Sequence, residues 1–163
     1  HSFYEYLKDM GVRNISVFSS FPSHSYTALK TIVDLGFTTK EPVVVDGVSM
    51  RPLDFAGEVL RKIPVPEGYT EKENLWLKVF GQKNGEKKDV EMDCVANTLP
   101  EWEDATCNID TGFPAAIVAE MIADGRINEP GMYSPEFVVP PEPFFQELGT
   151  RKIAIYENGK KIN

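Results

Sequence analysis

The sequence predicts an α+β fold with a mixed, largely antiparallel sheet. Two pairs of apolar, β-rich segments are each joined by a short turn, Asp46-Gly47 in one pair and Asn84-Gly85 in the other. These dipeptides are typical of tight β-hairpins. Other segments place apolar residues at helical spacing. Hairpins interleaved with helices indicate α+β, and 163 residues are the size of one domain, residues 1–163.

The first part of the chain alternates predicted helices and strands. Residues 2–10 are expected to form a short helix, and residues 12–18, rich in β-branched and aromatic side chains, a strand. Ser23 or Ser25 can cap the next helix, which we expect to end at Gly36.

Two hairpins follow. Residues 43–50 predict the first hairpin, and Pro52 suits the first turn of a helix that continues to Leu60. Residues 75–81 and 88–96 alternate in polarity and predict two longer antiparallel strands.

The remaining elements centre on an unusually apolar segment. Residues 105–109 are interpreted as a third strand, and residues 111–123 as a helix that begins at Thr111. Apolar residues cover nearly its whole circumference, so we expect burial on more than one side. Residues 128–143, with five prolines, predict an extended loop. A helix over 143–148 and a strand over 152–156 complete the chain.

Charge and apolar content exclude several function classes. Seventeen basic and 25 acidic residues give a net charge of −8, whereas nucleic acids and anionic membranes require a positive surface. The longest uncharged apolar run, residues 111–119, is far shorter than the roughly 20 residues that span a bilayer. The N-terminus lacks the pattern of a signal peptide. We therefore expect a cytoplasmic protein that binds neither nucleic acid nor membrane.

The residues of common metal and nucleotide sites are also missing. The histidines are His1 and His24, and Cys94 and Cys107 form no C-x-x-C pair, so no zinc site is expected. Reduced thiols are expected in the cytoplasm, and a disulfide between the two cysteines is the alternative. No glycines match G-x-G-x-x-G or G-x-x-x-x-G-K-[ST], the two common phosphate cradles.

Several segments, in order, resemble the second domain of the saccharopine dehydrogenase-like NAD(P)-dependent oxidoreductases. Residues 20–24, Ser-Phe-Pro-Ser-His, are similar to the family's Arg-Tyr-Pro-Gly-His turn, and Leu35-Gly36-Phe37 to the end of its next helix. Residues 41–52 resemble the family's hairpin and the start of the following helix. Residues 110–119, Asp-Thr-Gly-Phe-Pro-Ala-Ala-Ile-Val-Ala, are similar to its Thr-Thr-Gly-x-Pro-Ala-Ala-Ile-Val-Ala segment. Residues 143–148 are similar to its tail.

The resemblance implies a fold and a function. It implies helices packed on one face of the sheet, as in the C-terminal domain of glyceraldehyde-3-phosphate dehydrogenase. It also implies the substrate-binding and dimerisation domain of an oxidoreductase that acts on an amine-linked dicarboxylic amino acid with NAD or NADP. In such enzymes an N-terminal Rossmann domain, absent from residues 1–163, binds the cofactor. We therefore expect a homodimer. Without the Rossmann domain, residues 1–163 are expected to bind no cofactor, to be inactive and to contain no catalytic residue.

The resemblance also selects candidate substrate-binding residues. Ser20, Phe21 and His24 occupy the turn motif, where an imidazole could bind a substrate carboxylate or simply cap the helix. Ser20 offers only a hydroxyl where the family has arginine. Thr111 and Gly112 are expected at a helix N-terminus, whose free N–H groups attract anions, or act only as a cap and a packing residue. The departure at Ser20 and the missing nucleotide motif support an alternative, a non-catalytic assembly or small-ligand-binding module.

Overall fold

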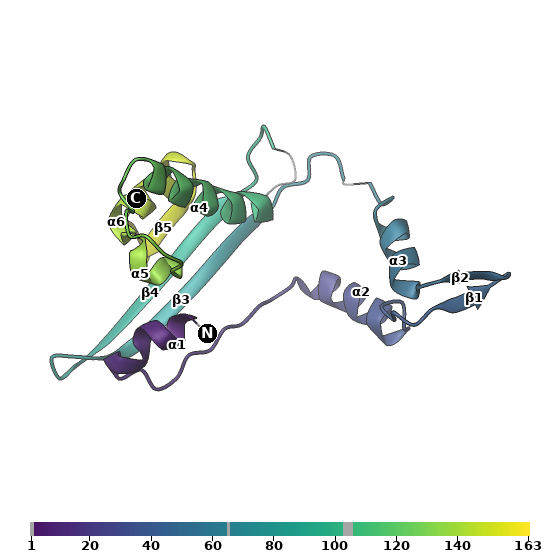
Figure 1. Cartoon of the computed structure of the whole chain (residues 1–163), viewed down its shortest axis with the longest axis horizontal. Coiled ribbons are helices and arrows are strands. Elements are labelled where there is room, and N and C mark those ends of the chain that lie inside the picture. The colour runs from purple at the N-terminus through teal and green to yellow at the C-terminus, as the bar shows by residue number, and fades with distance from the viewer. Residues whose placement is uncertain (1, 65, 103–105) are drawn as a thin grey trace. The chain divides into compact units, whose positions relative to one another are not determined.

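The computed structural model describes residues 2–64, 66–102 and 106–163. The chain separates into two compact units, one made of His1–Arg13 and Glu67–Asn163 and the other of Asn14–Pro66. Both combine helices with antiparallel strands, which confirms the α+β prediction (Figure 1). None of the helices in the described ranges is both long and apolar enough to cross a bilayer.

The larger unit is built on a four-stranded sheet. Its strands are β3 (Lys72–Lys83), β4 (Glu86–Asn97), β5 (Ala154–Glu157) and β6 (Lys160–Lys161), in that order across the sheet. Every neighbouring pair is antiparallel. Asn84 and Gly85 have φ of 56° and 82° at the tip of the β3–β4 hairpin, as a primed turn requires. The predicted hairpin is confirmed, and both strands extend beyond their predicted ends.

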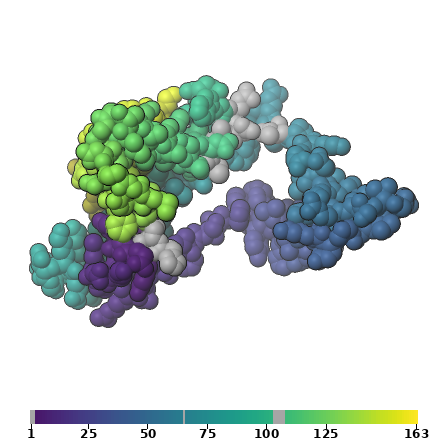
Figure 2. Space-filling view, in the orientation of Figure 1, coloured from purple at the N-terminus to yellow at the C-terminus, as the bar shows by residue number. Residues whose placement is uncertain are grey.

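Helices cover one face of this sheet (Figure 1). They are α4 (Thr106–Ala123), the short α5 (Pro135–Val138) and α6 (Pro141–Thr150). The buried core joins α4 and α6 to β4 and β5, and the residues from α4 onward pack closely, green to yellow in Figure 2. The core residues are Ala96, Leu99, Ile109, Ile117, Met121, Ile127, Leu148, Ile153 and Ile155.

An ion-pair network on the surface ties α4 to α6. Arg151 contacts Glu120 of α4 at 2.5 Å and Glu147 of α6 at 2.7 Å. Arg126, just beyond α4, contacts Glu147 at 2.9 Å. Glu147 therefore accepts hydrogen bonds from two arginines, and the network holds the two helices beside each other above the core.

The N-terminal segment forms a helix but no strand. α1 (Ser2–Leu7) continues as the 3-10 turn η1 (Lys8–Met10), and Tyr6 packs edge-on against Phe137 of α5 at 5.1 Å between ring centres. The predicted strand over 12–18 is wrong, because these residues form no regular element. Val17 and Phe18 are 84% and 89% exposed. A strand needs a partner for its backbone groups, and none of the described strands pairs with this segment.

The smaller unit contains four predicted elements and little burial. They are α2 (Ser23–Asp34), β1 (Val43–Val45), β2 (Val48–Met50) and α3 (Pro52–Leu60). β1 and β2 form the expected antiparallel hairpin. None of the residues described in this unit is fully buried, so its apolar side chains form no closed core of their own.

Three sequence predictions around the apolar helix need correction. The predicted strand over 105–109 is wrong where the structure describes it, because residues 106–109 form the first turn of α4 and residue 105 lies outside the described part. The predicted loop over 128–143 contains α5, and the helix predicted over 143–148 begins at Pro141. Burial explains the longer α4: Ile109 and Ile117 are two helical turns apart on one stripe that packs into the core.

Candidate functional site

The N-terminal end of α2 carries three of the predicted site residues, Ser20, Phe21 and His24. Pro22 precedes the helix with φ −51° and ψ 140°, and its carbonyl accepts the first helical hydrogen bond, from Tyr26 N–H at 2.9 Å. The N–H groups of the residues from 23 to 25 therefore have no acceptor within the helix. None of the described side chains caps them, and the first turn contains no acidic residue.

This helix end is open to solvent and suited to a carboxylate. Ser20 and His24 are exposed, and Phe21 is 61% exposed. Free N–H groups and the helix dipole give the end partial positive charge, and the His24 ring and the Ser20 hydroxyl are further hydrogen-bond donors. Phe21 adds an apolar surface beside them. The arrangement can bind an anionic group and orient its carbon chain, and it contains no acid–base pair.

Thr111 and Gly112 do not begin a helix, contrary to the prediction. α4 starts at Thr106, so both residues lie in its second turn, where N–H groups bond to carbonyls of the preceding turn. Both are exposed, and the Thr111 hydroxyl lies 3.5 Å from Asp110 Oδ1. A side chain at Gly112 would meet open space, so close packing does not explain this glycine either. The Pro114 that suggested a helix start lies inside α4.

The two groups of predicted residues belong to different units. Ser20, Phe21 and His24 are in Asn14–Pro66, and Thr111 and Gly112 are in the larger unit. Each group is therefore a candidate contact surface of its own unit.

Sequence reasoning missed a pair of carboxyl groups beside Thr111. Glu73 of β3 and Asp110 of α4 share a side-chain hydrogen bond. Burial raises the pKa of Glu73, and the nearby charge and hydrogen bond of Asp110 raise it further. Burial also raises the pKa of Asp110, and hydrogen bonds with Glu73 and Thr111 partly oppose that rise. The signal available in the sequence was Asp110, where the related motif has threonine.

Cys94 lies near this pair and is a free thiol. Burial, together with the negative charge of Asp110, raises its pKa to about 11. The thiol is therefore protonated at neutral pH and is a poor nucleophile. The side chain of Cys107 lies outside the described residues, so the prediction of two reduced thiols can be compared with the structure only at Cys94. Among the side chains described, no three potential metal ligands converge.

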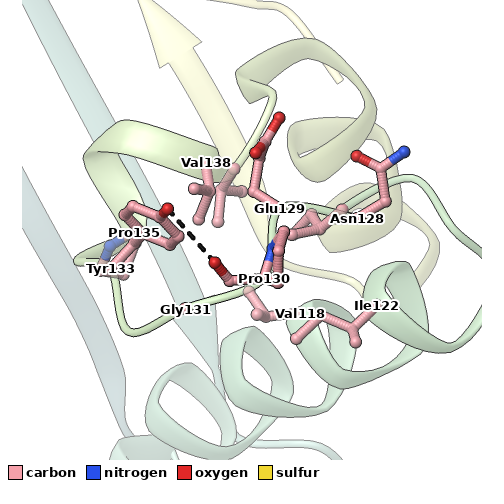
Figure 3. A pocket seen from close by; sticks show the side chains of 11 residues that line it. Val118, Ile122, Asn128, Glu129, Pro130, Gly131, Tyr133, Pro135 and Val138 are labelled. Atoms are coloured by element: carbon pink, nitrogen blue, oxygen red, sulfur yellow. Dashed lines mark hydrogen bonds between the residues drawn. The ribbon is translucent and has the colours of Figure 1, made fainter.

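An open apolar groove lies between α4 and the proline-rich segment (Figure 3). Its volume is about 460 Å³. Val118 and Ile122 line it from α4, and the Tyr133 hydroxyl donates to the carbonyl of Pro130 at 3.4 Å on the opposite side. The groove can accept an apolar or aromatic group. It is lined by Val118, Ile122, Ile127, Asn128, Glu129, Pro130, Gly131, Tyr133, Pro135, Val138 and Val139.

The described residues do not fit a dinucleotide. A dinucleotide cradle requires a parallel β–α–β unit with a glycine-rich turn at the start of its helix. All the described strand pairs are antiparallel, and the sequence contains no G-x-G-x-x-G. Neither candidate surface therefore offers a place for NAD or NADP.

The comparison with known families identifies the family of the chain. The model of the saccharopine dehydrogenase C-terminal domain matches residues 5–153, a span that includes Ser20, His24 and Thr111. The matched span covers most of both units and ends at Ile153, the core residue immediately before β5. The chain belongs to the saccharopine dehydrogenase C-terminal domain family.

Proposed function

We propose that this chain is the substrate-binding and dimerisation domain of an NAD(P)-dependent, saccharopine dehydrogenase-like oxidoreductase. The family match over residues 5–153 is the observation that carries the proposal. The substrate class is an amine-linked dicarboxylic amino acid. The cofactor belongs to a Rossmann domain outside residues 1–163, because these residues offer no dinucleotide cradle. That domain would supply the hydride chemistry, and this chain would bind and orient the substrate in the cytoplasm.

One substrate carboxylate is proposed to bind at the start of α2. The free N–H groups there, with His24 and Ser20, favour an anion, and Phe21 would contact the methylene chain. Thr111 and Gly112 remain proposed contacts, but through the exposed Thr111 hydroxyl and the open surface at Gly112 rather than through a helix end. We also propose that the parent enzyme is a homodimer.

The binding proposal is tested by NMR titration of the ¹⁵N-labelled chain. The probes are saccharopine and L-glutamate, with 1,5-diaminopentane as a control that lacks carboxylates. We expect chemical-shift changes at residues 20–26 with saccharopine and L-glutamate but not with the diamine. His24→Ala should lose at least half of the affinity for both compounds. A matched variant, His24→Gln, retains a hydrogen-bond donor and should lose less. Shifts that avoid residues 20–26, or equal shifts with the diamine, would overturn the assignment.

The proposed cofactor arrangement has its own test. NADPH added to the same labelled chain should cause no saturable shifts. The coding DNA upstream of residue 1 should encode, in the same reading frame, a segment with the pattern of a strand, a G-x-G-x-x-G turn and a helix. The departure at Ser20, where the family has arginine, favours the second candidate function, a non-catalytic assembly or ligand-binding module. A reading frame without the nucleotide-binding segment would support that candidate and overturn the oxidoreductase proposal.

A further inference from the structure

The β3 strand is an exposed edge of the sheet. β4 pairs with one side of β3 over its whole length, from Lys72 opposite Asn97 to Lys83 opposite Glu86. On the other side, none of the described strands pairs with it. The apolar residues of its middle section are each more than half exposed, on both faces of the strand: Leu75, Trp76, Leu77, Val79 and Phe80. A long, apolar, uncovered edge of this kind is prone to pair with another strand.

The direction of the backbone groups along this edge follows from the β4 contacts. Glu91 N–H donates to Asn158 Oδ1 at 3.0 Å, and the Glu91 carbonyl accepts from Asn158 N–H at 2.8 Å, so Glu91 directs its backbone away from β3. Lys78 lies opposite Glu91. Residues opposite each other in an antiparallel ladder either both exchange hydrogen bonds or both point outward. Lys78 therefore directs its N–H and carbonyl to the open edge, as do Trp76 and Phe80.

The charge of this hairpin favours a second copy of the same chain as the partner. The chain carries a net charge of −8, which opposes association of two copies over most of its surface. The β3–β4 hairpin, residues 72–97, carries five lysines and five acidic residues and so has no net charge. Two copies can therefore approach each other at this hairpin without net repulsion.

We propose that two copies of the chain pair antiparallel through the outer edges of β3, with the two-fold axis at Leu77. This inference rests on the homodimer proposed above and names its contact surface. The register places Leu77 opposite the partner's Leu77, Leu75 opposite the partner's Val79, and Trp76 opposite the partner's Lys78. The last pair allows a cation–π contact. A register shifted to centre on Lys78 would instead place two lysines opposite each other.

Such pairing satisfies both open edges at once. Trp76 and Lys78 would exchange backbone hydrogen bonds with their counterparts, and the leucine and valine side chains would form one apolar strip across the two-fold axis. The contact is self-complementary and closes, so it produces a dimer and not a fibre.

The register is tested by a disulfide across the axis. In Leu77→Cys the two introduced thiols of a dimer face each other in a non-hydrogen-bonded pair, where the Cβ atoms are about 4.5–5.5 Å apart, so mild oxidation should give a covalent dimer. Leu75→Cys is the matched control: its side chain is equally exposed, but it faces the partner's Val79 and should not cross-link. Wild-type chain controls for Cys94 and Cys107. Equal cross-linking of both variants, or of neither, would overturn the register.

The edge itself is tested by light scattering after size-exclusion chromatography over a range of concentrations. Lys78→Pro removes an outward N–H without removing a bond to β4, and Leu77→Asp places two carboxylates at the axis. Both should reduce the dimer fraction at least tenfold while circular dichroism stays unchanged. Val44→Asp, at a more exposed site in β1, should leave the dimer intact.

The results of these experiments distinguish the proposed β3 contact surface from the homodimer proposal itself. A wild-type dimer that survives both β3 variants would overturn the β3 surface and keep the homodimer. A monomeric wild type at all concentrations would overturn both proposals and leave the substrate proposal to its own titration.

Discussion

Glu73 at the start of β3 and Asp110 in the second turn of α4 are joined by a hydrogen bond between their carboxyl groups. Burial, and then the charge and hydrogen bond of Asp110, raise the pKa of Glu73, so a proton on Glu73 strengthens the contact between the two groups. The pair connects the edge strand β3 to α4, the helix that supplies three of the nine core residues. Its strength must therefore depend on pH.

The sign of that dependence follows from the raised pKa. The folded protein keeps the proton to higher pH than the unfolded chain, so the stabilisation is complete below the ordinary carboxyl range and is lost as pH rises through the raised pKa of Glu73. Glu73→Gln keeps a donor without needing a proton. We expect it to exceed wild type in stability at pH 7 by up to about 1 kcal/mol, and by much less near pH 4.

Urea unfolding at both pH values measures this difference. Glu86→Gln, at the exposed tip of the same hairpin, is the control and should change little at either pH. Greater stability of wild type than of Glu73→Gln at pH 7 would contradict the raised pKa of Glu73.

Glu147 should show the opposite sign. Hydrogen bonds from Arg151 and then Arg126 hold the pKa of Glu147 below its ordinary value. Its stabilisation is present above the ordinary carboxyl range and is lost as pH falls through the lowered pKa. Glu147→Gln should lower Tm at pH 7, and the difference from wild type should shrink in acid and in high salt. Glu142→Gln, on an exposed site of the same helix, is the control.

Core packing along α4 predicts a large contrast between two isoleucines. Ile117 is 0% exposed within the core, whereas Ile122 of the same helix is 57% exposed. Ile117→Ala should cost about 2–4 kcal/mol of unfolding free energy, because it removes buried methyl groups and leaves a cavity. Ile122→Ala should cost less than about 1 kcal/mol. Denaturant unfolding of both variants measures the contrast, and equal costs would place the core elsewhere.

Asn163 fastens the middle of α6 to β5. Its Nδ2 donates to the carbonyls of Phe145 at 2.8 Å and Ile153 at 3.0 Å, and its Oδ1 accepts from Ile155 N–H at 2.9 Å. Asn163→Ala removes the side-chain partner of the Ile155 N–H and of the Ile153 carbonyl, whereas the Phe145 carbonyl keeps its helical bond, so the change should cost about 1–3 kcal/mol. The exposed Asn128→Ala is the control for thermal unfolding. A loss that is equal in both variants would show that the three bonds contribute nothing specific.

Hydrogen exchange offers a second measurement at this site. Ile155 N–H should exchange faster in Asn163→Ala than in wild type, while Val95 N–H in the neighbouring strand β4 should change less. This pattern would separate a local loss of hydrogen bonds from a general loss of stability.

Local signals explain the predictions that the structure confirms. Asp46-Gly47 and Asn84-Gly85 adopt the positive φ values that a primed turn needs. Each hairpin therefore follows from the two residues of its own turn. Pro52 begins α3 for a similarly local reason, its preset φ. The position of α2 was predictable in the same way, but the predicted cap was wrong: Pro22 is the N-cap, and neither Ser23 nor Ser25 caps the helix.

Contacts distant in sequence explain the predictions that failed. Residues 12–18 have the composition of a strand, but no described strand pairs with them. Thr111 has the pattern of a helix start, yet burial of Ile109 extends α4 by more than a turn before it. Glu73 and Asp110 lie in β3 and α4, and no local motif in the sequence indicates that these two elements place their carboxyl groups together.

The sequence by itself determined the class of fold, both hairpins, the family and the position of α2, because turn geometry, helical periodicity and short motifs depend on neighbouring residues. Only the tertiary structure decided where α4 begins, which carboxyl groups lie beside each other and that β3 is the edge strand of its sheet. These features depend on which surfaces meet, since burial of Ile109, desolvation of Glu73 and exposure of Trp76 are set by distant elements of the chain.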